Sequence, residues 1–84
     1  MNSFPELEEW ENMVKRFYVE ATKVYKFRIV EFKSGTGSYV DWARAYSPLP
    51  PGSKILDFED VFSNENAMNL LISWAISQYF PEDE

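Results

Sequence analysis

The stretch from Asn66 to Pro81 carries no charged side chain over sixteen consecutive residues, and ten of these residues are apolar. A surface helix of a globular protein normally pairs one apolar stripe with a charged face. Here the narrow second face consists of small uncharged residues. A chain of 84 residues has little interior, since a domain of this size buries roughly 60–65% of its unfolded surface. The run therefore predicts a helix that is either the central core helix or partly covered by another protein.

Residue content narrows the class of protein. The chain has no cysteine and no histidine, which excludes disulfides, zinc fingers and imidazole general bases. The first ten residues lack the basic and apolar regions of a signal peptide, and the uncharged run is too short to span a membrane. We expect one soluble cytoplasmic domain over residues 1–84, with no cofactor and no membrane partner.

The N-terminal segment predicts a helix over residues 4–23. Ser3 and Glu6 have the spacing of a capping box, and Pro5 falls in the first turn, where its missing N–H costs nothing. An apolar stripe with alternating spacings of three and four then marks one buried helix face. Its members are Leu7, Trp10, Val14, Phe17, Ala21 and Val24.

The middle of the chain predicts a β-hairpin. Alternation from Tyr25 to Ile29 is typical of a strand with one buried face, and Val30 and Phe32 continue on the opposite parity. Either a bulge shifts the register or the outer face is also covered. The turn signal at 34–38 favours a returning strand over 39–46, although a short helix there is an alternative.

The proline-rich loop at 47–53 precedes a third short strand at 54–58, with Ile55 and Leu56 inward. Ser63 or Asn64 then caps a last helix over about 64–80. These elements predict a two-layer α+β domain with an N-terminal helix, an antiparallel hairpin, a third strand and a C-terminal helix.

Charge is segregated along the chain. Residues 1–14 sum to −4, residues 15–54 to +5 and residues 55–84 to −7, which gives the net charge of −6. Acidic residues at helix starts have a local explanation in the helix dipole. The functional interpretation is an acidic face that docks on a basic surface of a larger protein. Its candidate residues are Glu6, Glu8, Glu9, Glu11, Asp57, Glu59 and Asp60.

Leu70 and Trp74 are the candidate apolar contacts of this partner, since interface anchors are enriched in tryptophan. The resulting hypothesis is a small acidic, non-enzymatic binding protein that acts as an inhibitor or accessory factor. Small acidic antagonists such as DNA-mimicking inhibitors and nuclease immunity proteins offer an analogy of size and charge only.

Two other functions compete with this hypothesis. The hairpin interleaves Lys26, Arg28, Lys33 and Arg44 with aromatic residues, as single-strand nucleic-acid platforms do, but the net charge disfavours a nucleic-acid partner. A structural homodimer through the last helix is the second. The acidic residues match no metal-binding motif, and no residue pattern indicates catalysis, so we expect no metal and no enzyme.

Overall fold

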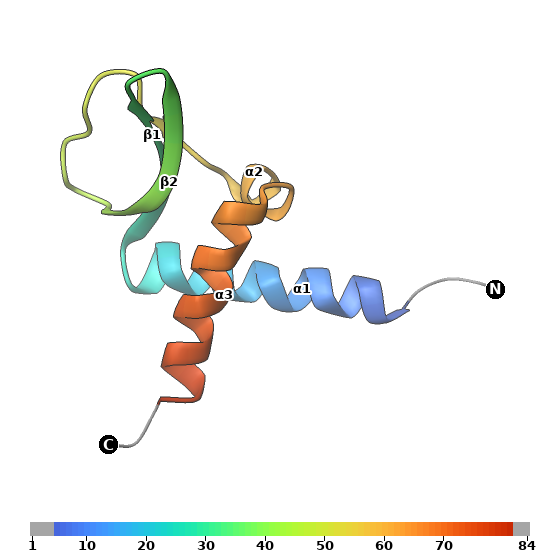
Figure 1. The fold of residues 1–84 in the computed structure, drawn as a ribbon. Coiled ribbons are helices and arrows are strands. Elements are labelled where there is room, and N and C mark those ends of the chain that lie inside the picture. The colour runs from blue at the N-terminus through green and yellow to red at the C-terminus, as the bar shows by residue number, and fades with distance from the viewer. Residues whose placement is uncertain (1–4, 82–84) are drawn as a thin grey trace.

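The computed structural model describes residues 5–81. The order of elements is helix α1 (Pro5–Val19), π-helix η1 (Glu20–Val24), strands β1 (Phe27–Ser34), β2 (Gly37–Arg44) and β3 (Lys54–Ile55), and helices α2 (Phe58–Phe62) and α3 (Glu65–Tyr79). The α+β class, the N-terminal helix, the three-stranded antiparallel sheet and the C-terminal helix are confirmed (Figure 1). The predicted cap at Ser3 lies outside the described residues.

The first helix changes its winding before it ends. The amide of Tyr25 donates to the carbonyl of Glu20 at 3.1 Å, a bond across five residues that defines a π turn. The helix thus continues to Val24, close to the predicted end at residue 23, but its last turn is a π turn that the sequence analysis did not predict. Because the wider turn rotates the following side chains off the apolar stripe, Val24 is 66% exposed although the stripe placed it inside.

The hairpin has an unbroken register from the pair Phe27 and Arg44 to the pair Ser34 and Gly37. Residues 39–46 accordingly return as a strand up to Arg44, and no bulge is present. Gly35 has φ +58° while Thr36 keeps a negative φ, a pattern typical of the two-residue type II′ turn. The turn residues thus fix the register of the hairpin.

Both faces of β1 are covered, which explains its mixed apolar pattern. Ile29 faces the helices and Val30 is equally buried, although adjacent strand residues point to opposite faces. The strand order is β2-β1-β3, so residues 45–53 must cross β1. They cross on the face away from α1 and α3, where the Arg28 guanidinium donates to the carbonyl of Ser47 at 2.6 Å.

The segment after the loop folds differently from the prediction. Strand β3 ends at Ile55, which is half-exposed, whereas Leu56 is buried as expected. Asp57 then begins helix α2, which the sequence analysis did not predict. The Asp57 carboxylate accepts from the amide of Asp60 at 2.9 Å, and the Asp60 carboxylate accepts from the amide of Asp57. This reciprocal cap stops the strand because it satisfies the first amides of a helix.

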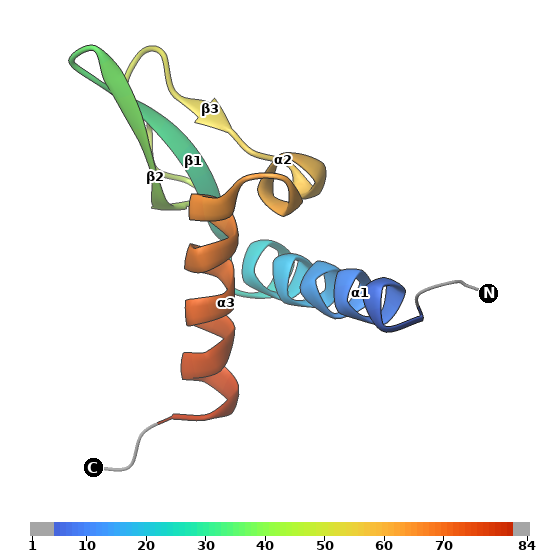
Figure 2. The same cartoon turned by 45° about the vertical axis from the view of Figure 1, so that its right-hand side comes forward.

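Helix α3 begins where one of the two candidate caps stands. The side chain of Asn64 accepts from the amide of Ala67 at 3.0 Å. The core then forms where α1 and α3 cross beneath the sheet (Figure 2). Its buried members are Val14, Ala21, Ile29, Leu56, Val61, Ala67 and Leu71.

The molecule is open in shape. Its radius of gyration is 14.4 Å, against about 12 Å expected for a domain of this length. Its accessible surface is 6197 Å², against about 5200 Å² for a monomer of this mass. The N-terminal part of α1 and the C-terminal part of α3 both project beyond the crossing point (Figures 1 and 2). Leu7 and Trp10 near the start of α1, and Ile76 and Phe80 near the end of α3, are accordingly exposed.

Candidate functional site

The predicted acidic residues of α1 and α2 lie toward one end of the molecule. Helix α2 packs against α1, where the ring of Phe58 meets the ring of Tyr18 edge-on at 5.8 Å. The Lys15 ammonium lies 5.8 Å from the centre of the same Phe58 ring. This packing places α2 on the same side of the crossing as the projecting part of α1 (Figure 2). We call the resulting surface the acidic end, formed by Glu6, Glu8, Glu9, Glu11, Asp57, Glu59 and Asp60.

The carboxylates of the acidic end are not all equally available. The four glutamates of α1 and Glu59 are exposed. Asp57 and Asp60 are engaged in capping α2, so their charges serve the helix as well as the surface. The pKa of the nearby Tyr18 hydroxyl is raised, first by burial and then by the negative charges of Asp57 and Asp60. These two charges thus act on a neighbouring group despite their capping role.

Two apolar side chains accompany the α1 glutamates. Leu7 is 62% exposed and Trp10 is 38% exposed, although both belong to the stripe that was predicted to be buried. They are exposed because α3 crosses α1 further along, where Val14 is fully buried. The sequence analysis missed them as candidate contacts, since their spacing is that of core residues. The concentration of glutamates around Leu7 and Trp10 was the only sequence feature that indicated their exposure.

The two predicted apolar contacts, Leu70 and Trp74, lie apart from the acidic end. Leu70 and Trp74 are both half-buried and pack against the core. The Trp74 ring lies 5.3 Å from the ring of Tyr25 and 6.2 Å from that of Trp42. Trp74 therefore joins α3 to the sheet and to the end of η1, and it is not grouped with the acidic end.

A shallow open groove follows α1 toward the free end of α3. The ring of Phe17 lies 5.7 Å from that of Tyr79, and the Tyr79 hydroxyl donates to the Glu20 carboxylate. This hydrogen bond is the main cause of the raised pKa of Tyr79. The groove is lined by Glu9, Asn12, Met13, Lys15, Arg16, Phe17, Val19, Glu20, Val24 and Tyr79. Its charges are mixed, unlike those of the acidic end.

Other classes of site have little support within residues 5–81. No polar or charged side chain of this part of the chain is fully buried. No group of three acidic, cysteine or histidine residues is placed there to hold a metal ion. None of the described helices has the length and apolar character needed to cross a membrane.

Comparison with known proteins gives no relative for this arrangement. No protein-family model, no curated protein and no solved structure matches the chain.

Proposed function

We propose that this chain is a non-enzymatic, cytoplasmic binding protein that docks its acidic end on a basic surface of a larger protein. The observation that supports this most strongly is the position of Leu7 and Trp10. Both are exposed on the projecting part of α1, among glutamates with no base before Lys15. A helix of this kind fits an apolar groove with a basic rim. Occupation of such a groove would make the protein an inhibitor or an accessory factor.

Electrostatics and apolar burial have separate roles in this docking. The glutamates attract the basic rim and accelerate association, an effect that weakens as salt screens the charges. Leu7 and Trp10 then supply binding energy that slows dissociation. With 62% of its surface exposed, Leu7 would contribute about 1–2 kcal/mol when buried.

Photocrosslinking can identify the partner and test in the same experiment whether the acidic end contacts it. A photoreactive phenylalanine analogue placed at Glu8 should crosslink one basic protein in host cells, whereas the same probe at Thr36 on the hairpin turn should not. The purified partner is then titrated with the chain at low and high salt. Equal crosslinking from both positions would contradict docking through the acidic end.

Two matched double variants distinguish the effect of the acidic end on association from the effect of the overall net charge. The double substitution Glu8→Gln and Glu9→Gln removes two charges from the acidic end, and Glu31→Gln with Asp41→Asn removes two from the sheet. We expect the first pair to slow association several-fold and reduce its salt dependence, and the second to change little. Similar effects from both pairs would show that only net charge matters. Circular dichroism controls for the loss of favourable helix-dipole interactions.

A homodimer through α3 is the second candidate. Ile76, Tyr79 and Phe80 are all more than half exposed at the free end of this helix, and exposed contiguous apolar surface is typical of interaction sites. Light scattering over a wide concentration range tests it, with Ile76→Asp as the disrupting variant. A monomer at every concentration would remove the homodimer and leave the docking proposal intact.

A further inference from the structure

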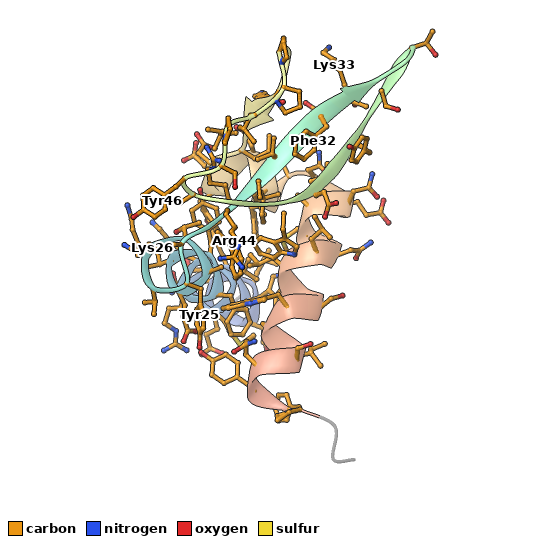
Figure 3. The ribbon with its side chains drawn as sticks, turned by 90° about the vertical axis from the view of Figure 1, so that its left-hand side faces the viewer. Tyr25, Lys26, Phe32, Lys33, Arg44 and Tyr46 are labelled. Carbon is orange, nitrogen blue, oxygen red and sulfur yellow. The ribbon has the colours of Figure 1, made fainter. Side chains whose placement is uncertain are left out.

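A second charged surface lies on the other side of the molecule. Lys26 and Arg44 are exposed at the base of the hairpin with Tyr25 and Tyr46 near them, and Lys33 is exposed toward the hairpin tip (Figure 3). We call these five residues the basic face. The basic face has no role in the proposed docking, because docking uses the acidic end, which lies on the other side of the crossing of α1 and α3.

The basic face is held in place by backbone hydrogen bonds. The amide of Ala45 donates to the carbonyl of Lys26 at 2.8 Å, and the amide of Ser47 donates to that of Arg44 at 3.1 Å. The second bond closes a turn with Tyr46 near its tip. Arg28 fastens this turn, since its guanidinium reaches the carbonyls of Arg44 and Ser47 at 3.1 and 2.6 Å. Lys26, Arg44 and Tyr46 are therefore fixed beside one another.

The exposed aromatic rings differ in what they can still contact. Tyr46 is 83% exposed, so its ring contributes little to the core. Tyr25 is 44% exposed and contacts Trp74 edge-on. In contrast, Phe32 and Tyr39 already stack on each other, with ring centres 5.3 Å apart. Tyr46 and Tyr25 are thus the rings that remain able to stack on a ligand.

Lys26 has a left-handed backbone conformation that glycine usually occupies. Its φ is +62°, and it is the only non-glycine residue with positive φ among residues 5–81. Left-handed backbone is unfavourable for residues with a Cβ. Strained residues of this kind cluster at functional sites. The left-handed backbone of Lys26 therefore marks this lysine as a candidate functional residue.

We propose that the basic face binds single-stranded nucleic acid. Cationic side chains that follow a phosphate backbone and aromatic rings that stack on bases are the two parts of such sites. Lys26 directly precedes β1 and Lys33 lies near the other end of this strand, roughly 20 Å from Phe27 along the extended backbone, which suits a short stretch of single strand. Tyr46 and Tyr25 supply stacking surfaces near Lys26 and Arg44. Duplex DNA, whose bases are already stacked, would use only the charges.

The net charge of −6 does not prevent this binding. Exposed charges are screened within about 10 Å at 0.1 M salt, and the molecule extends 46 Å along its longest axis. The projecting glutamates of α1 lie on the far side of the helix crossing from the basic face (Figures 1 and 3). At this salt concentration a bound strand is therefore largely screened from these glutamates.

The test is fluorescence anisotropy of the whole chain with a labelled oligothymidylate of about 20 nucleotides, longer than typical single-domain sites. We expect binding at low salt with a slope of log affinity against log salt near −2, as three cations and single-stranded phosphates require. Tyr46→Ala should weaken binding about fivefold or more through lost stacking. Because Tyr46 is so exposed, this variant should fold normally.

Two further variants distinguish a site from general charge. Lys26→Glu with Arg44→Glu should abolish binding, whereas Lys15→Glu with Arg16→Glu makes the same charge change on α1 and should reduce it much less. Lys26→Gly should weaken binding although it relieves the strained backbone, a combination that a merely destabilised protein would not give. Glu8→Gln with Glu9→Gln should leave binding intact, so this proposal and the docking proposal can fail separately.

Several results would overturn the proposal. These are no binding at low salt, equal loss from the two charge reversals, or affinity for duplex DNA as high as for the single strand. If polyglutamate displaces the oligonucleotide at equal charge concentration, the basic face recognises acidic polypeptides instead, and the nucleic-acid assignment is wrong.

Discussion

The hydrogen bond between Tyr18 and Leu56 offers the most direct test of how the acidic end is built. The hydroxyl of Tyr18 donates to the carbonyl of Leu56 at 3.1 Å across 38 residues of sequence. It joins α1 to the segment that leads into α2. Substitution Tyr18→Phe removes this bond and keeps the ring contact with Phe58. The variant therefore isolates one hydrogen bond at the junction of the two acidic segments.

The expected loss is about 0.5–1.5 kcal/mol of unfolding free energy, the usual net value of an intramolecular hydrogen bond. Tyr18 is only half-buried, so water can reach the released carbonyl and keep the loss in this range. For a domain of 60–100 residues, a change of 1 kcal/mol lowers the melting temperature by roughly 4–8 °C. Both quantities are measurable by urea and thermal unfolding.

The difference between the wild type and Tyr18→Phe should also depend on pH. Burial and the charges of Asp57 and Asp60 raise the pKa of Tyr18 from its ordinary value of 10.0, so the folded state favours the neutral hydroxyl. The advantage of the wild type is complete below pH 10.0, the unfolded value, and it declines as pH rises toward the higher folded pKa. Phenylalanine cannot titrate, so the difference between the two proteins isolates this effect.

The assay is urea unfolding followed by circular dichroism at neutral pH and at several values above pH 10. Tyr46→Phe is the control at neutral pH, since its side chain is 83% exposed and its substitution should not change the stability. Equal stability of the wild type and Tyr18→Phe at neutral pH would refute the reasoning about this bond. A difference that stays constant above pH 10 would refute the assignment of the raised pKa.

Four further substitutions, one of them a control, test the fold. Leu71→Ala should cost about 2–5 kcal/mol in urea unfolding because this side chain is fully buried, while Ile76→Ala on the same helix, which is 53% exposed, should cost less than about 1 kcal/mol. Asn64→Ala removes the cap of α3 and should cost about 1 kcal/mol; no change in melting temperature would contradict the capping role. Lys26→Gly should raise the unfolding free energy by about 0.5–1 kcal/mol, the relieved left-handed strain less the added freedom of glycine in the unfolded chain, and a destabilised variant would contradict the strain at Lys26.

Several elements could be predicted because their signals act between close neighbours in sequence. Glycine at position 35 has the positive φ that the turn needs, and the unbroken pairing beyond it makes residues 37–44 a strand. Asn64 caps α3 through an amide three residues away. The cap of α2 is also local, but it uses the pair Asp57 and Asp60 in place of the serine–glutamate pattern, and the apolar residues before it suggested a continued strand.

The candidate site was only partly predictable. The exposure of the α1 glutamates follows from their charge, but the position of α2 beside α1 depends on the contact between Phe58 and Tyr18. Trp74 was expected as an anchor because it lies in an uncharged run, yet the rings of Tyr25 and Trp42 pack against it. Leu7 has the same helical spacing as the buried Val14, and only the crossing point of α3 distinguishes them.

The sequence by itself determined the two long helices, the hairpin with its turn geometry and the unequal distribution of charge, because each depends on residues within a few positions of one another. The tertiary structure decided which apolar residues remain exposed, how the two acidic segments come to lie on one side of the helix crossing, and why Lys26 and Tyr46 lie together opposite them. The physical reason is that burial and local potential depend on the other segments that pack against a residue, and these segments lie far away in the chain.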